Sequence, residues 1–519
     1  MKLICNANFF IMKYVKTGSY LSIILMSLFF AAQSSAQTLY HEPHRPQIHF
    51  SPKEHWINDP NGMVYYNGVY HLFFQHYPDS SVWGPMHWGH ATSRDLIHWQ
   101  QQPIALYPDS LGYIFSGSTV VDKNNTSGFG KAGKIPLVAI FTSHDPNKTG
   151  THSLERENQS IAYSLDNGIT WIKGPRNPVL KNPGIEDFRD PKVMWYDPAK
   201  KWIMTLAAQD QVMFYSSPNL KDWKKESEFG KAAGAHGGVW ECPDLFELEN
   251  NGKKVWVLIV NLNPGGPNKG SATQYFLGSF NGNTFKPFNT ETKWIDYGPD
   301  EYAGITWSNT GSRKIFLGWM SNWMYANQVP TERWRNATTL PRELKLQTIG
   351  KEMFLTSAPV KELDAISSKP VVIEHLPVAN SIDLTKKAGA TVSPFRINLE
   401  LDIIKNFSII LSNDSGEYIK VGYDKKNNRY FMDRVKSGKI DFTKDFAAVH
   451  TAPRLTKASK MNLWLIVDAS SAELFADNGL TVMTEIFFPN KPYHQIEIQS
   501  SDGMVIKRLS FMRLKSIWP

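Results

Sequence analysis

Three acidic residues stand in short stretches that are unusual for structural acids: Asp59 in WINDPNG, Asp190 in FRDP and Glu241 in WECP. Taken singly, each has an ordinary explanation, namely a tight turn, a local ion pair with Arg189 and a buried, hydrogen-bonded acid. Each stretch also begins a strand–turn–strand run, so the three recur at matching phases of one repeat. Hydrolysis of a glycosidic bond needs two carboxylates in different environments, one ionised and one holding its proton.

The neighbours of the three acids suggest a division of labour. Asp59, among turn amides, should be ionised, whereas Glu241, between Trp240 and Cys242, should keep its proton because burial disfavours the charged form. Asp190, beside Arg189, should stay ionised and accept hydrogen bonds from sugar hydroxyls.

The elements that must position these acids read as β-strands. Between about residues 50 and 350, short runs rich in β-branched and aromatic residues alternate with Gly, Pro, Asn and Asp, as in MVYYNGVYHLFF and KVMWYDPAKKWIMTL. No stretch of comparable length shows a sustained period of 3.6 residues. The sequence therefore predicts an all-β protein.

Two recurring sequence patterns divide this region into similar units. Turns running from Ser to a closing aromatic residue occur at SRDLIHW, SLDNGITW, SPNLKDW and SFNGNTF, with serines 71, 53 and 62 residues apart. Five strand starts, NDPNG, FSGS, RDPK, WECPD and WSNTG, alternate with these turns. Irregular repeats of this length favour a β-propeller, here with five blades whose first strands converge on a central channel.

The composition changes after residue 350. Of the 17 Trp residues, 15 come before that point, and short alternating strands with a DNG hairpin signal follow it. We therefore predict a five-bladed propeller over residues 37–355, a linker over 356–370 and an antiparallel β-sandwich over 371–519.

The first 36 residues have the pattern of a secretory signal peptide. Lysines precede the apolar run LSIILMSLFFAA, and the small residues SSA end at Ala36. We expect a secreted or periplasmic protein without a lipid anchor, started at Met1 or Met12. Cys242 would be the single cysteine of the mature chain, so an internal disulfide and a structural zinc site built on several cysteines are excluded.

The net charge and the spacing of the histidines limit which binding partners and cofactors the sequence predicts. The net charge of +8 falls to +5 without the signal segment, which carries three lysines and no acid. Because the sequence has no block of Lys or Arg, we do not expect it to bind nucleic acid. Six histidines between His55 and His98 lack a metal-binding spacing, and we expect no metal and no cofactor.

The ordered motifs WINDPNG, FSGS, FRDP and WECP, supported by QHYP, GWMSNW and LPREL, resemble glycoside hydrolase family 32, the β-fructosidases. The resemblance extends from about residue 45 to 515 and implies a five-bladed propeller followed by a β-sandwich. It also implies that Asp59 is the nucleophile, Glu241 the general acid/base and Asp190 the transition-state stabiliser. The family retains anomeric configuration, which sets the two catalytic carboxyls roughly 5–5.5 Å apart.

The resemblance also marks a substrate pocket. The positions that match family residues lining the fructose site are Asn58, Gln75, Trp83, Phe115, Ser116 and Arg189. We add Trp56 of the first motif, and we expect Trp83 and Trp319 to stack on sugar rings.

The function that follows is release of fructose from β-fructans, fructo-oligosaccharides or sucrose by a monomeric exo-β-fructosidase, with a dimer as the alternative state. Three rivals stay open: endo attack or fructosyl transfer at the same site, an inverting arabinose- or xylose-specific relative of family 43, and a sugar-binding propeller without catalysis.

Overall fold

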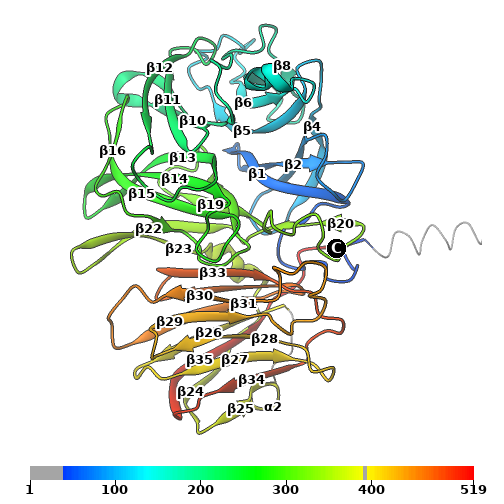
Figure 1. Ribbon diagram of the computed structural model, residues 1–519, viewed down its shortest axis with the longest axis vertical. Helices are drawn as coiled ribbons and strands as arrows, with labels where there is room; N and C mark the ends of the chain where they lie inside the picture. Colours follow the sequence, from blue (N-terminus) through cyan, green and yellow to red (C-terminus); the bar gives the residue numbers. More distant parts are fainter. Residues whose placement is uncertain (1–38, 390–393) are drawn as a thin grey trace, which may run out of the picture. The chain divides into compact units, whose positions relative to one another are not determined.

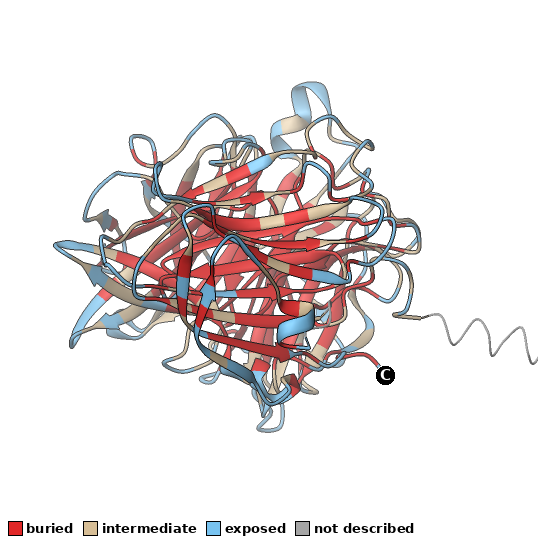
Figure 2. Cartoon of the chain, turned by 90° about the horizontal axis from the view of Figure 1, so that it is seen from below, coloured by how far each residue is buried: buried red, intermediate tan, exposed pale blue. Residues whose placement is uncertain are grey.

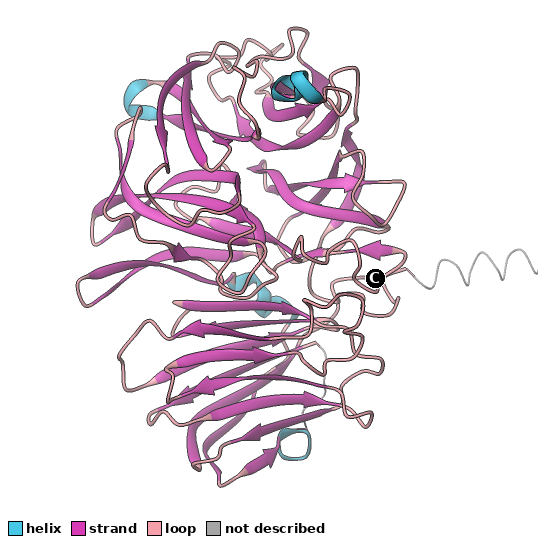
Figure 3. Cartoon of the chain, in the orientation of Figure 1, coloured by secondary structure: helices cyan, strands magenta, loops and turns pink. Residues whose placement is uncertain are grey.

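The computed structural model describes residues 39–389 and 394–519, and nearly all regular structure there is β-strand (Figure 3). Buried residues concentrate in the strands (Figure 2). The helices within these ranges are the 3-10 turns η1 (Gly150–Glu155), η2 (Asp197–Ala199) and η3 (Lys361–Ile366) and the α-helical turn α2 (Leu384–Lys387). The all-β prediction is confirmed, whereas the predicted signal peptide, residues 1–36, lies outside the described residues.

Five separate sheets follow one another between residues 55 and 359, in the upper part of Figure 1. Within each sheet, strands that follow in the chain pair side by side and antiparallel. Sheet by sheet, the strands are β1 (His55–Tyr66), β2 (Val69–Tyr77), β3 (His87–Ser93), β4 (Gln100–Leu106); β5 (Tyr113–Val121), β6 (Leu137–His144), β7 (Glu157–Ser164), β8 (Ile172–Lys173); β9 (Phe188–Tyr196), β10 (Lys201–Ala208), β11 (Gln211–Ser217), β12 (Lys224–Phe229); β13 (Val239–Asn250), β14 (Lys253–Asn263), β15 (Ala272–Phe280), β16 (Phe285–Pro287), β17 (Lys293–Trp294); β18 (Tyr302–Thr306), β19 (Ile315–Met320), β21 (Ala337–Thr338), β22 (Arg342–Ile349), β23 (Glu352–Pro359).

The first strands of the five sheets lie around a common centre. They contact one another in cyclic order, from β1 through β5, β9, β13 and β18 back to β1. A late strand, β20 (Trp334–Arg335), pairs parallel to the start of β1 and so ties the end of this region to its beginning. The five-blade count stays a prediction, and this ring of contacts supports it.

The recurring serine turns have one physical basis. Ser93, Ser164 and Ser217 each end the third strand of a sheet, and each hydroxyl donates to the Asp or Asn side chain two residues later. The backbone N–H of that residue returns a hydrogen bond to the serine oxygen. This local pairing fixes the turn into the fourth strand, which explains why the pattern is visible in the sequence.

Every first strand also carries a β-bulge at the same place. In each sheet, three steps along the first strand correspond to two along its partner, so one extra residue is inserted and the strand bends. Proline occupies two of the bulges, as Pro191 and Pro243, where a missing N–H costs no ladder hydrogen bond. The paired residues that flank the bulges are Ile57 and Pro60, Ile114 and Gly117, Arg189 and Lys192, Glu241 and Asp244, and Tyr302 and Ile305.

One predicted strand start is wrong. WSNTG, at residues 307–311, begins after β18 has ended and lies in its connection to β19. The first strand of the fifth sheet is instead YAGIT, residues 302–306. That strand, like the one that begins the second sheet, has no carboxylate in its bulge.

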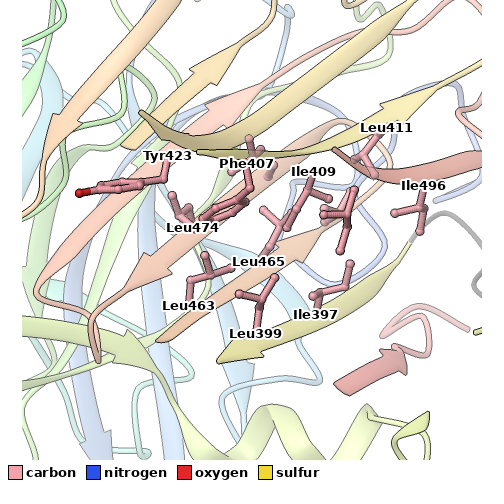
Figure 4. Packing of buried hydrophobic residues seen from close by; sticks show 14 of the residues in the cluster. Ile397, Leu399, Phe407, Ile409, Leu411, Tyr423, Leu463, Leu465, Leu474 and Ile496 are labelled. Carbon is pink, nitrogen blue, oxygen red and sulfur yellow. The ribbon is translucent and has the colours of Figure 1, made fainter. Parts of the chain in front are cut away.

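The C-terminal region is a sandwich of two six-stranded sheets. Alternate residues point inward, so that Ile397 and Leu399 of one sheet face Ile409 and Leu411 of the other (Figure 4). In sheet order, the strands are β24 (Val371–Val378), β35 (Met504–Arg513), β26 (Phe395–Leu401), β31 (Met461–Val467), β32 (Ser471–Ala476), β33 (Thr481–Ile486); and β25 (Ser381–Asp383), β34 (Gln495–Gln499), β27 (Phe407–Ser412), β28 (Tyr418–Asp424), β29 (Arg429–Asp433), β30 (Val449–Pro453).

The predicted linker, residues 356–370, differs from the structure in its first half. Residues 356–359 complete β23, which pairs along its whole length with β22, and η3 follows at once. Their small polar side chains resemble a linker, but Thr356 and Ser357 are buried. The sandwich starts with β24 at residue 371, where the composition placed it.

Buried ion pairs join the five-sheet region to the sandwich. Arg342 lies between Asp296, at 2.9 Å, and Glu473 of β32. Arg434 of the sandwich contacts Asp300 at 2.6 Å. All five side chains are fully buried, so each charge depends on its partners, and the pairs Arg342–Glu473 and Arg434–Asp300 cross between the two regions.

Candidate active site

A cavity of about 360 Å³ lies where the bulges of four first strands meet. This volume is within the range of small-molecule sites. Its lining residues are Asn58, Asp59, Gln75, Trp83, Phe115, Ser116, His144, Arg156, Glu157, Asp187, Arg189, Asp190, Glu241 and Trp323. All three predicted acids are therefore brought together at one cavity.

WINDPNG is a strand and not a turn. All seven residues belong to β1, and Asn58 and Asp59 fill its bulge. The turn-forming residues suit this position because Pro60 directly follows the bulge and Gly62 adopts a positive φ of 57°. The turn predicted at Asp59 is therefore a bulge within a strand.

The three acids occupy successive positions of equivalent bulges. Glu241 is the last paired residue before its bulge, Asp190 the first residue within its bulge and Asp59 the second. Their phases therefore match to within two residues, not identically. Such offsets aim the three carboxyls at one cavity from three different strands.

The carboxylate of Asp59 is held from both sides. Asn58 Nδ2 donates to Oδ1 at 2.9 Å, and Ser116 Oγ donates to Oδ2 at 2.7 Å. Cys242 Sγ lies 3.5 Å from the same Oδ2. Trp56 orients Asn58 in turn, because its indole N–H donates to Asn58 Oδ1 at 2.7 Å.

Two contacts fix Asp190, one made by its own backbone and one made by β13, the strand that carries Glu241. It has a positive φ of 65°, a conformation that is uncommon for residues other than glycine, and its own N–H donates to Thr142 Oγ1. The backbone N–H of Cys242 donates to Asp190 Oδ2 at 3.0 Å. Strain at this bulge therefore directs the carboxyl toward the cavity.

Glu241 is held by a cation and a phenol. Arg189 approaches its Oε1 with Nε at 3.1 Å and Nη2 at 2.9 Å. The hydroxyl of Tyr302 donates a short hydrogen bond to Oε2. The other guanidinium nitrogen of Arg189 contacts Asp187 at 2.5 Å and Glu157 at 3.1 Å.

These contacts change the charge states expected from the sequence. Burial raises the pKa of Glu241, against the opposing effect of Arg189, as its predicted proton-holding role requires. Burial also raises the pKa of Asp190, to about 8, although it was predicted to stay ionised. Arg189 still lowers that pKa, but its hydrogen bonds go to Glu241, Asp187 and Glu157.

Six predicted substrate contacts, namely Asn58, Gln75, Trp83, Phe115, Ser116 and Arg189, line the cavity. Gln75 Nε2 is buried and has no hydrogen-bond partner in the described structure, so it can donate to a ligand. Trp83 is 40% exposed, and the edge of its ring meets Phe115 at 6.3 Å between centroids.

The two remaining predictions differ from the structure. Trp56 and Trp319 are completely buried, pack on each other at 6.1 Å and do not line the cavity. Both also pack on Trp323, which does line it. The sequence around a tryptophan does not reveal whether its ring is exposed to a ligand or covered by other side chains, because the residues that cover it come from distant parts of the chain.

The sequence missed several residues of the site. Tyr302 lies in the strand whose start was misplaced, and Glu157, Asp187 and His144 form a charged cluster around Arg189. Asp187 lies only two residues before Arg189, so the sequence offered a signal for this contact. Glu157 and His144 come from other strands, and nothing in the sequence placed them beside Arg189. Within the described ranges, no group of three His, Cys, Asp or Glu side chains is arranged to hold a metal ion.

Comparison with protein families gives two adjoining matches. Residues 49–359 match the model described as Glycosyl hydrolases family 32 N-terminal domain, and residues 362–515 match Glycosyl hydrolases family 32 C terminal. The junction between the two matches falls between β23 and η3, where the five-sheet region ends in the structure.

Known proteins show the same likeness over most of the chain. It is 46% identical to a levanase of Bacillus subtilis, covering 95% of this chain and 74% of the levanase. It is 41% identical to an extracellular exo-inulinase of Aspergillus niger, covering 92% and 96% of the two chains. The crystal structure of an exo-inulinase from Aspergillus awamori superposes with a TM-score of 0.85 at 38% identity, over 92% and 100%. A fructofuranosidase of Schwanniomyces occidentalis complexed with fructose gives a TM-score of 0.82 at 33% identity, over 92% and 99%. These likenesses confirm the predicted fold class, a propeller followed by a sandwich.

Proposed function

We propose, because this chain belongs to glycoside hydrolase family 32, that it is a retaining β-fructosidase which releases fructose from the ends of β-fructans, fructo-oligosaccharides or sucrose. The single observation that carries the proposal is the meeting of Asp59, Asp190 and Glu241 at one cavity, each held by contacts suited to a different task.

Asp59 is the proposed nucleophile. Its carboxyl oxygens accept hydrogen bonds from Asn58 and Ser116, and in its proposed role it attacks the anomeric carbon. The attack forms a covalent fructosyl–enzyme ester as the bond to the leaving oxygen breaks. Ser116 and Asn58 also restrict the rotation of the carboxylate, so that its attacking oxygen is positioned before the substrate arrives.

Glu241 is the proposed general acid and base. In the first step it gives its proton to the leaving oxygen, and in the second it removes a proton from water, which attacks the ester and releases fructose. Its raised pKa supports the first role. The contact with Arg189 supports the second, because a nearby cation stabilises the carboxylate left after proton transfer.

Asp190 is the proposed stabiliser of the transition state, through hydrogen bonds to fructose hydroxyls. The proximity of the Cys242 backbone N–H and of Arg189 supports its ionisation when a sugar supplies further donors. The cavity, at about 360 Å³, supports binding of a terminal unit and therefore exo attack.

The proposed setting is secretion or the periplasm. The relatives named extracellular support it, and in the described part of the chain no helix is long and apolar enough to cross a membrane. A monomer is the proposed state.

Chromatography of the first products from levan, inulin and sucrose tests the proposal. We expect fructose as the sole early product from both polymers. A ladder of oligosaccharides would instead indicate endo attack, products longer than the substrate would indicate fructosyl transfer, and no release from any of the three would leave a binding protein.

A further inference from the structure

A second cavity, of about 850 Å³, lies farther along the same first strands that hold the acids. It shares no lining residue with the first cavity. Along β9, Tyr196 is roughly 20 Å from Asp190 at about 3.3 Å per residue. The two cavities therefore open at different places on the five-sheet region.

One wall of this second cavity is aromatic. Trp195, Tyr196 and Trp256 line it and are each partly exposed. Tyr196 and Trp256 lie 6.1 Å apart at 45°, and Trp195 is set against the buried Trp202 at 5.0 Å and 67°. Rings that are held from behind and open in front can stack on apolar faces of sugar rings without losing much side-chain freedom.

Several polar groups of this cavity are paired with one another. Lys254 contacts Glu247 at 2.9 Å, and the indole N–H of Trp195 donates to the Asp197 carboxylate at 3.3 Å. The lining carries four lysines and three carboxylates, namely Lys123, Lys192, Lys254, Lys314, Asp197, Asp244 and Glu247. Nearly balanced charge favours an uncharged, hydroxyl-rich ligand over an anion or a nucleic acid.

The acid at the base of this cavity is not free for catalysis. Asp244 Oδ2 accepts hydrogen bonds from both the backbone N–H and the hydroxyl of Thr306, each at 2.7 Å, and lies 3.4 Å from Lys192 Nζ. Three groups thus hold one oxygen of a carboxylate that is 1% exposed, which suits a structural role and not attack on a sugar.

We propose that this cavity is a second, non-catalytic carbohydrate-binding site, which takes an uncharged oligosaccharide segment against Trp195, Tyr196 and Trp256. The identity of that segment as β-fructan rests on the proposed function. Because Tyr196 of the aromatic wall is roughly 20 Å from Asp190 along β9, the site holds a neighbouring chain, or a distant part of the same polymer, while the active site trims an end.

Native gel electrophoresis in gels containing inulin or levan tests the site, with dextran gels as reference. The protein carries Asp59→Ala so that the polymer is not consumed. We expect the added pair Trp195→Ala and Trp256→Ala to reduce retardation by fructan about threefold or more. The matched control is Trp464→Ala, because Trp464 is a partly exposed tryptophan on the sandwich that lines neither cavity.

The same pair in the otherwise unchanged enzyme separates the second site from the first. We expect hydrolysis of sucrose to be unaffected and the KM for polymer to rise about threefold to tenfold at constant kcat. Unchanged retardation, or an altered oligomeric state without lost retardation, would overturn the proposal, the latter in favour of a second copy of this chain.

Failure of the proposed second site and failure of the proposed hydrolysis give different experimental results. If the double variant loses sucrose hydrolysis or melts early, Trp195→Ala alone decides, and its unchanged retardation overturns the second site. An unsubstituted chain that hydrolyses no fructan, yet is retarded by it through Trp195, would sink the proposed hydrolysis and leave the binding site standing.

Discussion

The guanidinium of Arg189 contacts the carboxylate of Glu241, with 2.9 Å between Nη2 and Oε1. The sequence suggested a different partner, the adjacent Asp190. The bulge in β9 separates these neighbours, because Arg189 is the last paired residue and Asp190 enters the bulge with a positive φ. One cation thus stabilises the ionised form of the proposed acid/base while the acid beside it keeps a raised pKa.

Asp59→Ala and Glu241→Ala should fail in different ways. Loss of the nucleophile should abolish hydrolysis of every fructoside, on the order of 10⁴-fold or more, by analogy with other covalent catalysts. Loss of the acid/base should cost about 10²–10⁴-fold on sucrose and less on a fructoside with a good leaving group. The measurement is kcat/KM on both substrates, with melting curves to establish folding.

Added azide gives the control for this pair. It should rescue Glu241→Ala by attacking the fructosyl ester and forming fructosyl azide, because this step needs no general base. It should not rescue Asp59→Ala. If azide restored turnover to the Asp59 variant, or to both, the assignment of the two roles would be wrong.

Tyr302→Phe should shift the alkaline limb of the pH profile upward. Burial raises the pKa of Glu241, and both Arg189 and the Tyr302 hydroxyl oppose the rise by stabilising the carboxylate. Removing the hydroxyl therefore raises this pKa further, so that the acid stays protonated to higher pH while kcat falls. The pH dependence of kcat/KM on sucrose measures the shift, and a limb that moves to lower pH contradicts it.

Asp190→Asn should stabilise the empty protein at alkaline pH while reducing activity. The folded carboxyl holds its proton up to a pKa of about 8, against 3.8 in the unfolded chain. The folded state thus binds one proton more in this window, and stability falls as pH rises from about 4 to 8. Asparagine removes this loss, so the melting temperature should rise at pH 8, on the order of 2 °C or more.

Comparing the melting temperatures at pH 4 and pH 8 tests the predicted direction of the pH dependence. At pH 4 the folded carboxyl holds its proton and the unfolded one, with a pKa of 3.8, is only partly ionised, so most of the loss lies at higher pH. The variant should therefore melt close to the unsubstituted chain. A gain of the same size at both pH values would point to packing and not to titration. Activity should fall in either case, because the amide cannot take up the charge that sugar hydroxyls require.

Arg342→Met should destabilise the junction of the two regions. It leaves Asp296 buried without its cation and Glu473 with only His49, which costs about 3–5 kcal/mol. Thermal melting measures the loss. The control is Arg508→Met, whose partner Glu374 and own side chain are both about half exposed, so the expected cost is below about 1 kcal/mol.

The sequence by itself determined the all-β class, and it singled out the three acids that the structure brings to one cavity. Both rest on short-range chemistry that leaves a pattern in the chain: alternation in strands, the hydroxyl-to-Asx turns after Ser93, Ser164 and Ser217, and proline directly after Asp59 and Asp190. These signals act over two or three residues, and they can therefore be read locally.

Only the tertiary structure decided which charges meet. Arg189 finds Glu241, Tyr302 finds the same carboxylate, and Trp319 becomes fully buried against Trp56. Each of these contacts joins strands that are remote in the chain but adjacent around one centre. Burial and electrostatics depend on this spatial proximity, so the same WINDPNG could be read as a turn until the partner strand β2 showed it to be a bulged strand.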